Sequence, residues 1–160
     1  MTREKIPSTG AVRLLKQHNI PFTPRPYRYQ DKGGTKVSAR ELQVEEHRVI
    51  KTLVMETEQQ QALIVLMHGD REVSLKQLAR QLEVKQISPC PPARADRLTG
   101  YRTGGISPFG TRQTLPVYVE KGILELDTIY INGGRRGFLI EISPRDLQTV
   151  LQARIVEVAV

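Results

Sequence analysis

The sequence predicts one α/β domain of the α+β type, covering residues 1–160, with helices around a mixed sheet that curls into a barrel. A length of 160 residues suits one domain and suffices to bury a core without disulfides. The composition, 39% hydrophobic and 26% charged, is typical of a globular protein. Strand-like and helix-like segments alternate without a repeating βαβ unit, and the many short strands between turns favour a curled sheet.

Five segments carry helix signals. Ser8 can cap the first helix, which a proline at position 21 ends. Ser38 and Ser74 each precede a Glu or Gln by three residues, as in a capping box. Ser143 followed by proline is typical of a helix start. The predicted helices span residues 8–19, 38–44, 74–82, 93–98 and 143–152.

Runs of aliphatic and β-branched residues between turn signals predict the strands. The first extended segment contains prolines, which suit a sheet edge because proline has no ladder N–H. Turns are expected at 32–35 and 68–70. The predicted strands are 22–29, 49–55, 62–67, a short one at 87, 115–120, 128–131, 138–142 and 155–158.

The positive charge lies in the first quarter of the chain. Residues 1–40 hold nine Lys or Arg and two Asp or Glu, a net charge of +7, which equals that of the whole chain. Such a surface attracts polyanions, although a solvated, solubilising face is the simpler interpretation. Tyr27 and Tyr29 alternate with arginines, and aromatic rings in this setting can stack on unpaired bases.

Several classes of site are not expected. Cys90, the one cysteine, cannot form an internal disulfide, and we interpret it as a small spacer. The three histidines lack metal-ligand spacing, so we expect no metal, and no cofactor motif is present. No signal peptide or 18-residue apolar run occurs, which predicts a soluble cytoplasmic protein without membrane association. Without a nucleophile–base signature, an enzyme of this sequence must use positioning, electrostatics or a reactive group of its substrate.

Lys51 is the first candidate functional residue. In a strand it shares a face with Val49, Leu53 and Met55. Either the lysine lies at the mouth of a cavity, or its stem follows the sheet and its amine reaches water.

Two glycine-rich segments are the other candidates. Residues 99–110 contain four glycines, whose backbone amides could approach a phosphate or an oxyanion, although a tight structural turn is an equal alternative. Residues 131–137 read as a hairpin turn with paired glycines and two arginines that could contact phosphate. Asp146 falls in the first turn of the last helix, where it favours the helix dipole.

Together, IKTLV at 50–54, TGYRTGGISPFG at 99–110 and IYINGGRRG at 129–137 resemble the YbaK/EbsC family of aminoacyl-tRNA deacylases. This family includes the editing domain inserted in bacterial prolyl-tRNA synthetases. The order and separation of these motifs match those of the family, and the similarity in the order of elements extends over nearly the whole chain. The resemblance implies a mixed, mostly antiparallel sheet curled into a barrel with surrounding helices.

The resemblance also implies roles for individual residues. Lys51 matches the family's indispensable lysine, near the aminoacyl ester and the terminal adenosine, and is the expected catalytic residue. Tyr27 and Asp146 stand where members have a pocket tyrosine and an acidic residue. The expected substrate-binding residues are Tyr27, Gly104, Gly105, Ile106, Ser107, Gly133, Gly134 and Asp146; the expected tRNA-binding residues are Arg25, Arg28, Arg135 and Arg136.

The implied activity is deacylation in trans of mischarged tRNA, most typically Cys-tRNA(Pro) and otherwise Cys-tRNA(Cys). In cysteine-specific members the substrate's own thiol attacks its ester, whereas other members use water. The expected partners are aminoacyl-tRNA and, in a transient complex, prolyl-tRNA synthetase. The alternatives are a non-catalytic adaptor for tRNA or a synthetase, a deacylase for another misacylated tRNA, and a hydrolase of small esters.

Residues 28–36 (RYQDKGGTK) depart from the family pattern, in which a histidine-acid-proline run precedes a phenylalanine and a glycine. This departure leaves the amino-acid preference open. Asn132 replaces a common serine and Phe109 a common leucine.

Overall fold

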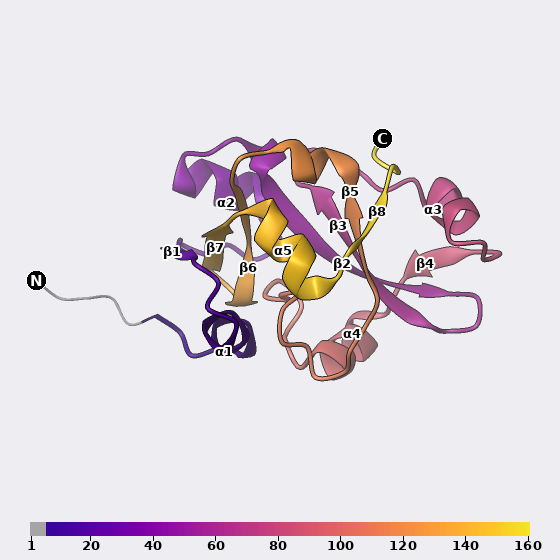
Figure 1. Cartoon of the computed structure of the whole chain (residues 1–160), viewed down its shortest axis with the longest axis horizontal. Helices are drawn as coiled ribbons and strands as arrows, with labels where there is room; N and C mark the ends of the chain where they lie inside the picture. The colour runs from indigo at the N-terminus through magenta and orange to yellow at the C-terminus, as the bar shows by residue number, and fades with distance from the viewer. Residues whose placement is uncertain (1–5) are drawn as a thin grey trace, which may run out of the picture.

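Eight strands form one mixed sheet in the computed structural model, which describes residues 6–160 (Figure 1). Their order is β1-β7-β6-β2-β3-β5-β8, and β4 pairs with β2. The pairs β1–β7, β7–β6, β2–β3 and β2–β4 are antiparallel, and β2–β6, β3–β5 and β5–β8 are parallel. The strands are β1 Thr23–Pro26, β2 Val49–Thr57, β3 Ala62–His68, β4 Ile87–Pro89, β5 Val117–Glu120, β6 Ile129–Arg135, β7 Phe138–Ile142 and β8 Arg154–Val156.

The α+β class and the mixed sheet are confirmed, but the predicted barrel is wrong, because the sheet stays open. The edge strands β1 and β8 have four and three residues and do not pair with each other. Pro24 and Pro26 remove two N–H donors from β1, so this strand cannot extend the ladder far.

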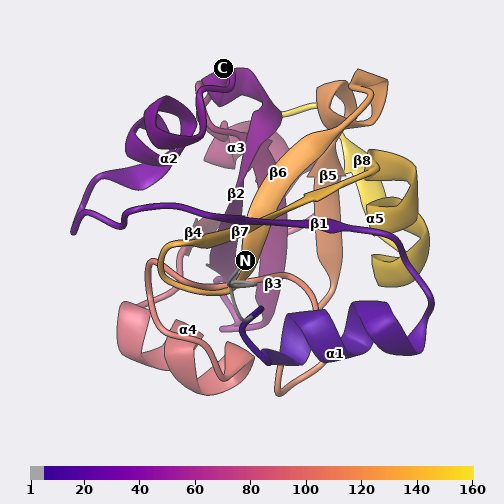
Figure 2. The ribbon, with the colours of Figure 1, turned by 90° about the vertical axis from the view of Figure 1, so that its left-hand side faces the viewer.

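Helices cover both faces of the sheet (Figure 2). Helix α5 lies on one side of it, with α1 and α4 at the lower end, and α2 and α3 lie on the other side. Two 3-10 helices, η1 Glu46–Arg48 and η2 Lys121–Glu125, connect strands. The α-helices are α1 Gly10–Gln17, α2 Gly34–Leu42, α3 Leu75–Gln81, α4 Pro92–Thr99 and α5 Pro144–Leu151.

Alternation along β2 decides which core each side chain enters. Ile50 and Val54 pack in the main core with residues of α1, α4 and α5. Val49 packs with a small cluster that includes Ala39 of α2, and Met55 packs with a third cluster around α3. Lys51 is on the same face of β2 as Val49 and Met55, between the area that α2 covers and the area that α3 covers.

The predicted elements are found, with shifted ends. Ser74 caps α3 as predicted, since its hydroxyl accepts from the Gln77 amide. Helix α1 is capped by Thr9 and not by Ser8. Helix α2 begins at Gly34, so Ser38 lies inside the helix, where its hydroxyl donates to the Thr35 carbonyl. The capping box at 38–41 and the turn through residue 35 are therefore wrong.

Strand β6 continues through the segment predicted as a hairpin turn. A bulge between Asn132 and Arg135 lets the strand absorb the two glycines, so the turn falls at Arg136 and Gly137. Helix α4 runs for eight residues, longer than predicted.

Two histidines that are distant in the sequence meet beside β3. The rings of His47 and His68 stack 3.7 Å apart, and His47 Nδ1 lies 2.8 Å from an Asp70 carboxylate oxygen. Burial lowers the pKa of His68, which keeps this ring neutral. Within residues 6–160, no helix has the length and hydrophobicity needed to cross a bilayer.

Candidate active site

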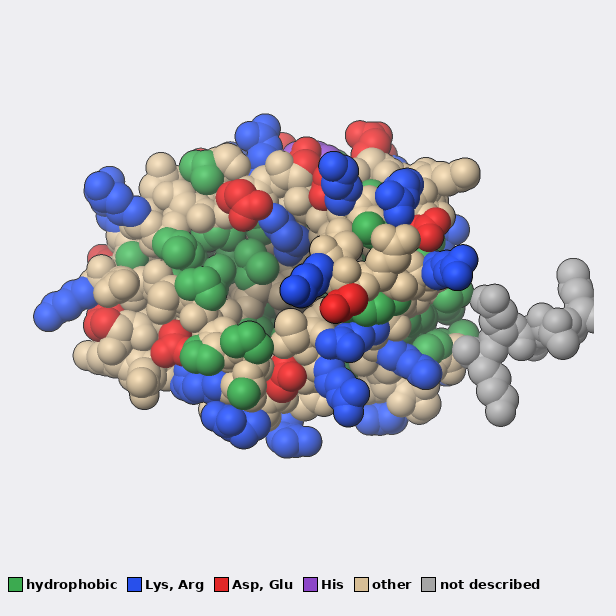
Figure 3. All heavy atoms as spheres, turned by 180° about the vertical axis from the view of Figure 1, so that it is seen from behind, with side chains coloured by type: hydrophobic (Ala, Val, Ile, Leu, Met, Phe, Trp, Pro, Cys, Tyr) green, Lys and Arg blue, Asp and Glu red, His purple; other side chains and the backbone are tan. Residues whose placement is uncertain are grey.

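A cleft of about 720 Å³ opens on the face of the sheet that carries α2 and α3. Residues from β2, the start of α2, the segment before α3, the glycine-rich loop and the β6–β7 hairpin line it. The face of the molecule turned away from the viewer in Figure 1 gathers hydrophobic side chains with Lys and Arg side chains beside them (Figure 3). Lys51, Gly104, Ile106, Tyr27 and Arg136 meet in this cleft, as the sequence predicts for one site.

Lys51 lies in the wall of the cleft. Its side chain is 19% exposed, and its Nζ donates to the Arg71 carbonyl and lies 3.4 Å from a Glu72 carboxylate oxygen. Of the two alternatives left open by the sequence, the cavity mouth is therefore correct. Glu72 is 83% exposed, so the ion pair is weak and an incoming anion can replace it.

The C-terminal residues hold the backbone that binds the Lys51 amine. Glu72 and Val160 exchange two backbone hydrogen bonds of 3.1 and 2.9 Å, and Ser74 donates to the Val158 carbonyl. The buried Glu120 carboxylate supports this pairing, because it accepts from the amides of Val158 and Ala159 at 2.6 and 3.2 Å. Val160 thus helps to position the Arg71–Glu72 backbone, whose Arg71 carbonyl accepts from the Lys51 amine.

We expect Glu120→Ala to destabilise the fold and to loosen the Lys51 anchor. The substitution leaves two backbone donors without an acceptor, at a cost of about 1–3 kcal/mol each where they stay buried. Thermal unfolding should show the loss, and Glu120→Gln, which keeps an acceptor oxygen, should restore most of it. Glu157→Ala is the matched control, because the Glu157 carboxylate is exposed and belongs to the C-terminal segment that Glu120 holds. Equal melting temperatures for Glu120→Ala and Glu157→Ala would contradict this role.

The β6–β7 hairpin holds the glycine-rich loop in place. Asn132 Nδ2 lies 3.4 Å from the Gly104 carbonyl, and Arg136 Nε donates to the Thr103 carbonyl at 3.0 Å. A Cβ on Gly105 would lie 2.6 Å from the Arg136 backbone nitrogen, so only glycine allows this approach. Gly104 has a φ of +92°, a conformation that favours glycine.

The loop offers fewer free amides than its glycine content suggests. The Gly105 amide donates to the Arg102 carbonyl at 2.7 Å, so it cannot also bind a ligand. Among residues 6–160, the amides of Gly104 and Ile106 have no acceptor. Because Gly104 and Ile106 line the cleft, whereas Ser107 and Gly110 do not, these two N–H groups are the candidate donors for an oxyanion.

Ser107 does not line the cleft. Its hydroxyl is fully buried and accepts from the Phe109 amide at 3.2 Å, so in this structure the residue supports the loop and does not face the cleft. The Tyr101 hydroxyl donates to the Phe109 carbonyl, which braces the same stretch. Burial raises the pKa of Tyr101 to about 12, so its phenol stays protonated.

Tyr27, Tyr29 and Arg136 form a wall at the hairpin end of the cleft. The Arg136 guanidinium lies 5.5 Å from the centre of the Tyr29 ring, a cation–π distance. Burial, and then the neighbouring Tyr29, raises the pKa of Tyr27. The Tyr27 phenol therefore stays protonated and can donate a hydrogen bond, and the rings of Tyr27 and Tyr29 both offer stacking surfaces.

Three expected substrate contacts lie elsewhere. Asp146 is in α5, which packs on the opposite face of the sheet, so it does not line the cleft, and its place in the first turn of the helix agrees with a dipole role. Gly133 packs against the Phe138 ring and Gly134 against Tyr101, so neither lines the cleft. They shape the hairpin that carries Asn132.

The expected tRNA-binding arginines differ in how free their charges are. The Arg25 guanidinium lies 3.7 Å from a Glu141 carboxylate oxygen and also over the Tyr130 ring. These two contacts pair its charge within the protein. Arg28, Arg135 and Arg136 are exposed. These three remain available to phosphates.

Sequence reasoning missed Asn132 and Glu72 as parts of the site. Asn132 was visible only as a departure from the family pattern, and nothing in the sequence near Glu72 indicates its contact with Lys51. Cys90 also lines the cleft, and burial raises the pKa of its thiol, so it is not an activated nucleophile. Within residues 6–160, no group of three His, Cys, Asp or Glu residues could hold a metal ion.

Comparison with known proteins assigns the chain to a family. The family model of the aminoacyl-tRNA editing domain matches residues 33–150. A protein of Enterococcus faecalis named "Putative Cys-tRNA(Pro)/Cys-tRNA(Cys) deacylase EbsC" is 26% identical over 151 residues, 94% of this chain and 92% of that protein. A proline–tRNA ligase of Moorella thermoacetica is 32% identical over 104 residues, 64% of this chain and 18% of the ligase.

A solved structure shares the fold. It is that of a "putative trans-editing enzyme for prolyl tRNA synthetase", with a TM-score of 0.82 and 22% identity, and the match covers 97% of this chain and 99% of that one. The family model spans more than half of the chain and contains Lys51, the glycine-rich loop and the hairpin. The chain therefore belongs to the aminoacyl-tRNA editing domain family.

Proposed function

We propose that this protein is a deacylase that removes cysteine from Cys-tRNA(Pro) in the cytoplasm. The family match supports editing of aminoacyl-tRNA as the general activity, and the homologue in Enterococcus faecalis suggests the cysteinyl substrate. The observation that carries the proposal is the placement of Lys51 and the Gly104–Ile106 backbone in one cleft.

In this proposal the cleft takes the 3′ end of the tRNA with its ester. The carbonyl oxygen of the ester accepts from the free amides of Gly104 and Ile106, which stabilise the negative charge that develops there. Such a donor is typically worth about 10²–10³ in rate. Lys51 exchanges Glu72 for a phosphate or ribose oxygen of the terminal nucleotide and so fixes its position.

The nucleophile comes from the substrate or from water. The cleft thiol, Cys90, is held protonated by burial and does not supply it. Attack by water breaks the ester C–O bond, the ribose oxygen takes a proton, and free cysteine leaves. Attack by the substrate thiol breaks the same bond and gives a thiolactone, which water then opens.

A panel of mischarged tRNAs tests the proposal. We expect the purified protein, without any synthetase, to deacylate Cys-tRNA(Pro) faster than Ala-tRNA(Pro) or correctly charged Pro-tRNA(Pro). Faster deacylation of another ester would indicate that the protein acts on a different misacylated tRNA. Binding of tRNA without hydrolysis of any ester would indicate an adaptor, and turnover of short ester mimics unaffected by uncharged tRNA would indicate a small-ester hydrolase.

Binding of tRNA should weaken steeply with salt. If the exposed Arg28, Arg135 and Arg136 contact phosphates of the unpaired end, the logarithm of the association constant falls with log[salt] with a slope of roughly −2. Fluorescence anisotropy with uncharged tRNA between about 50 and 300 mM KCl, roughly a six-fold range, measures the slope. A flat response would contradict the phosphate contacts.

A further inference from the structure

A second hollow adjoins the cleft on the other side of the Tyr27–Tyr29–Arg136 wall. This groove, of about 710 Å³, is lined by Ile6 and Pro7 before α1, by the prolines of β1, by Tyr27 and Tyr29, and by the β6–β7 hairpin. Tyr27, Tyr29 and Arg136 line both hollows, so the two are separated by a single layer of side chains. Because only this layer lies between them, a ligand long enough to cross the layer can occupy the cleft and the groove together.

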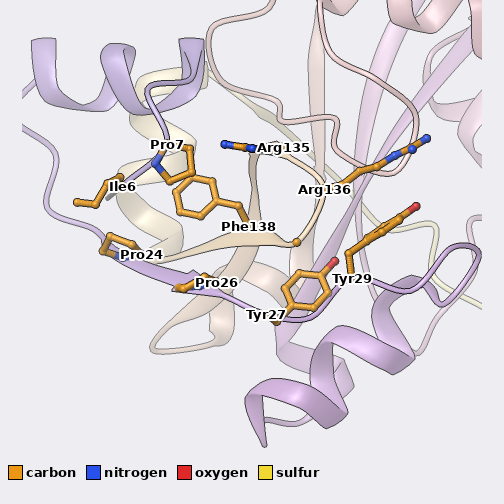
Figure 4. Close-up of a pocket in the computed structure, with 10 residues that line it drawn as sticks. Ile6, Pro7, Pro24, Pro26, Tyr27, Tyr29, Arg135, Arg136 and Phe138 are labelled. Atoms are coloured by element: carbon orange, nitrogen blue, oxygen red, sulfur yellow. The ribbon is translucent and has the colours of Figure 1, made fainter. Parts of the chain in front are cut away.

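The groove is built from flat apolar surfaces. Figure 4 shows the Phe138 ring near Pro7 and Pro24 at one end, and the rings of Tyr27 and Tyr29 at the other. Proline and aromatic rings present faces on which a planar group can stack without a fixed hydrogen-bond pattern.

The charge on the groove is positive. Its described lining includes Arg135 and Arg136 and no Asp or Glu. Arg136 donates through Nε to the Thr103 carbonyl, which holds the guanidinium between the two hollows. A chain that carries one negative charge between successive planar groups suits this arrangement, and an unpaired stretch of RNA has that pattern.

We propose that the groove binds the base of the nucleotide that precedes the terminal adenosine of the tRNA. The proposal rests on the proposed function, in which the cleft holds the terminal nucleotide and its ester. The intervening phosphate crosses the wall beside Arg136, and the preceding base stacks in the groove. A peptide in the groove is the competing occupant, disfavoured because Pro24 and Pro26 of the edge strand offer no N–H to a peptide backbone, whereas the charge of the described lining fits RNA.

The test removes one base from the ligand. Three-nucleotide RNAs with the sequence of the tRNA 3′ end are compared with the same RNAs carrying an abasic ribose before the terminal adenosine. We expect the abasic change to weaken binding to the wild-type protein about 10-fold, in line with roughly 1–3 kcal/mol for a stacked base. In the double variant Ile6→Asp/Arg135→Ala, the same change should have less than a 2-fold effect.

Arg145→Ala is the matched control, because this exposed arginine lies on α5, on the other face of the sheet. It should keep the full sensitivity to the missing base. Equal binding of the two RNAs by the wild type would overturn the proposal, as would equal base sensitivity in the double variant.

Because the readout is binding, it separates the two hypotheses. Base-dependent binding without deacylation of Cys-tRNA(Pro) would refute the proposed function and leave the groove assignment standing. Deacylation with no dependence on the preceding base would do the reverse.

Discussion

Replacement of Lys51 by alanine should lower kcat/KM for Cys-tRNA(Pro) by roughly 100-fold or more, the scale expected when a group that places the reacting atoms is lost. The fold should survive, because the side chain is partly exposed and its ionic partner Glu72 is almost fully exposed. Lys51→Arg should restore charge without restoring the position of the amine, and so recover little activity.

Two measurements make this result specific. Thermal unfolding of Lys51→Ala should stay close to that of the wild type, which separates lost chemistry from lost structure. Asp146→Asn is the control for the family-implied acidic residue, and it should keep its activity because α5 lies across the sheet from the cleft. Wild-type activity in Lys51→Ala, or a large loss in Asp146→Asn, would contradict the site described here.

Gly105→Ala is the second change with a large expected effect. The added Cβ would lie 2.6 Å from the Arg136 backbone nitrogen and 2.8 Å from the Arg135 carbonyl carbon, so the loop must move away from the hairpin. We expect a stability loss of about 1–3 kcal/mol from overpacking. The displaced Gly104 and Ile106 amides should also cost on the order of 10² in kcat/KM.

Gly100→Ala serves as its matched control in the same loop. Gly100 has a φ of +80°, so alanine there is strained by about 1–2 kcal/mol, but its Cβ would meet only Arg112 at ordinary contact distances. This variant should lose stability and keep its activity at temperatures where it is folded. If Gly105→Ala lost no more activity than Gly100→Ala, the loop backbone would not be part of the site.

Local patterns in the sequence predicted most of the elements, because helix caps and strand alternation depend on near neighbours. The alternation of β2 placed Lys51 correctly with Val49 and Met55, and from this follows its place on the α2–α3 face. The bulge at Asn132 could not be predicted in the same way, since paired glycines fit a hairpin turn equally well. Only the pairing of β6 with β7 decides between the two.

Contacts between distant segments account for the remaining differences. Asp146 was assigned by position in the chain, and the packing of α5 across the sheet puts it out of reach. The position of the Lys51 amine depends on the backbone pairing of Glu72 with Val160 and on the Glu120 carboxylate, contacts between distant segments that no local sequence pattern reveals. The bond from the Gly105 amide to Arg102 likewise depends on the path of the loop, which its glycine content does not determine.

A crystal structure with a non-hydrolysable 3′-cysteinylamino-adenosine would test the central claim most directly. The carbonyl oxygen of the bound analogue should lie within hydrogen-bond distance of the Gly104 and Ile106 amides, and Lys51 Nζ should turn from Glu72 to the nucleotide. An analogue bound outside the cleft, or one whose carbonyl faces solvent while Lys51 keeps its bond to Arg71, would contradict it.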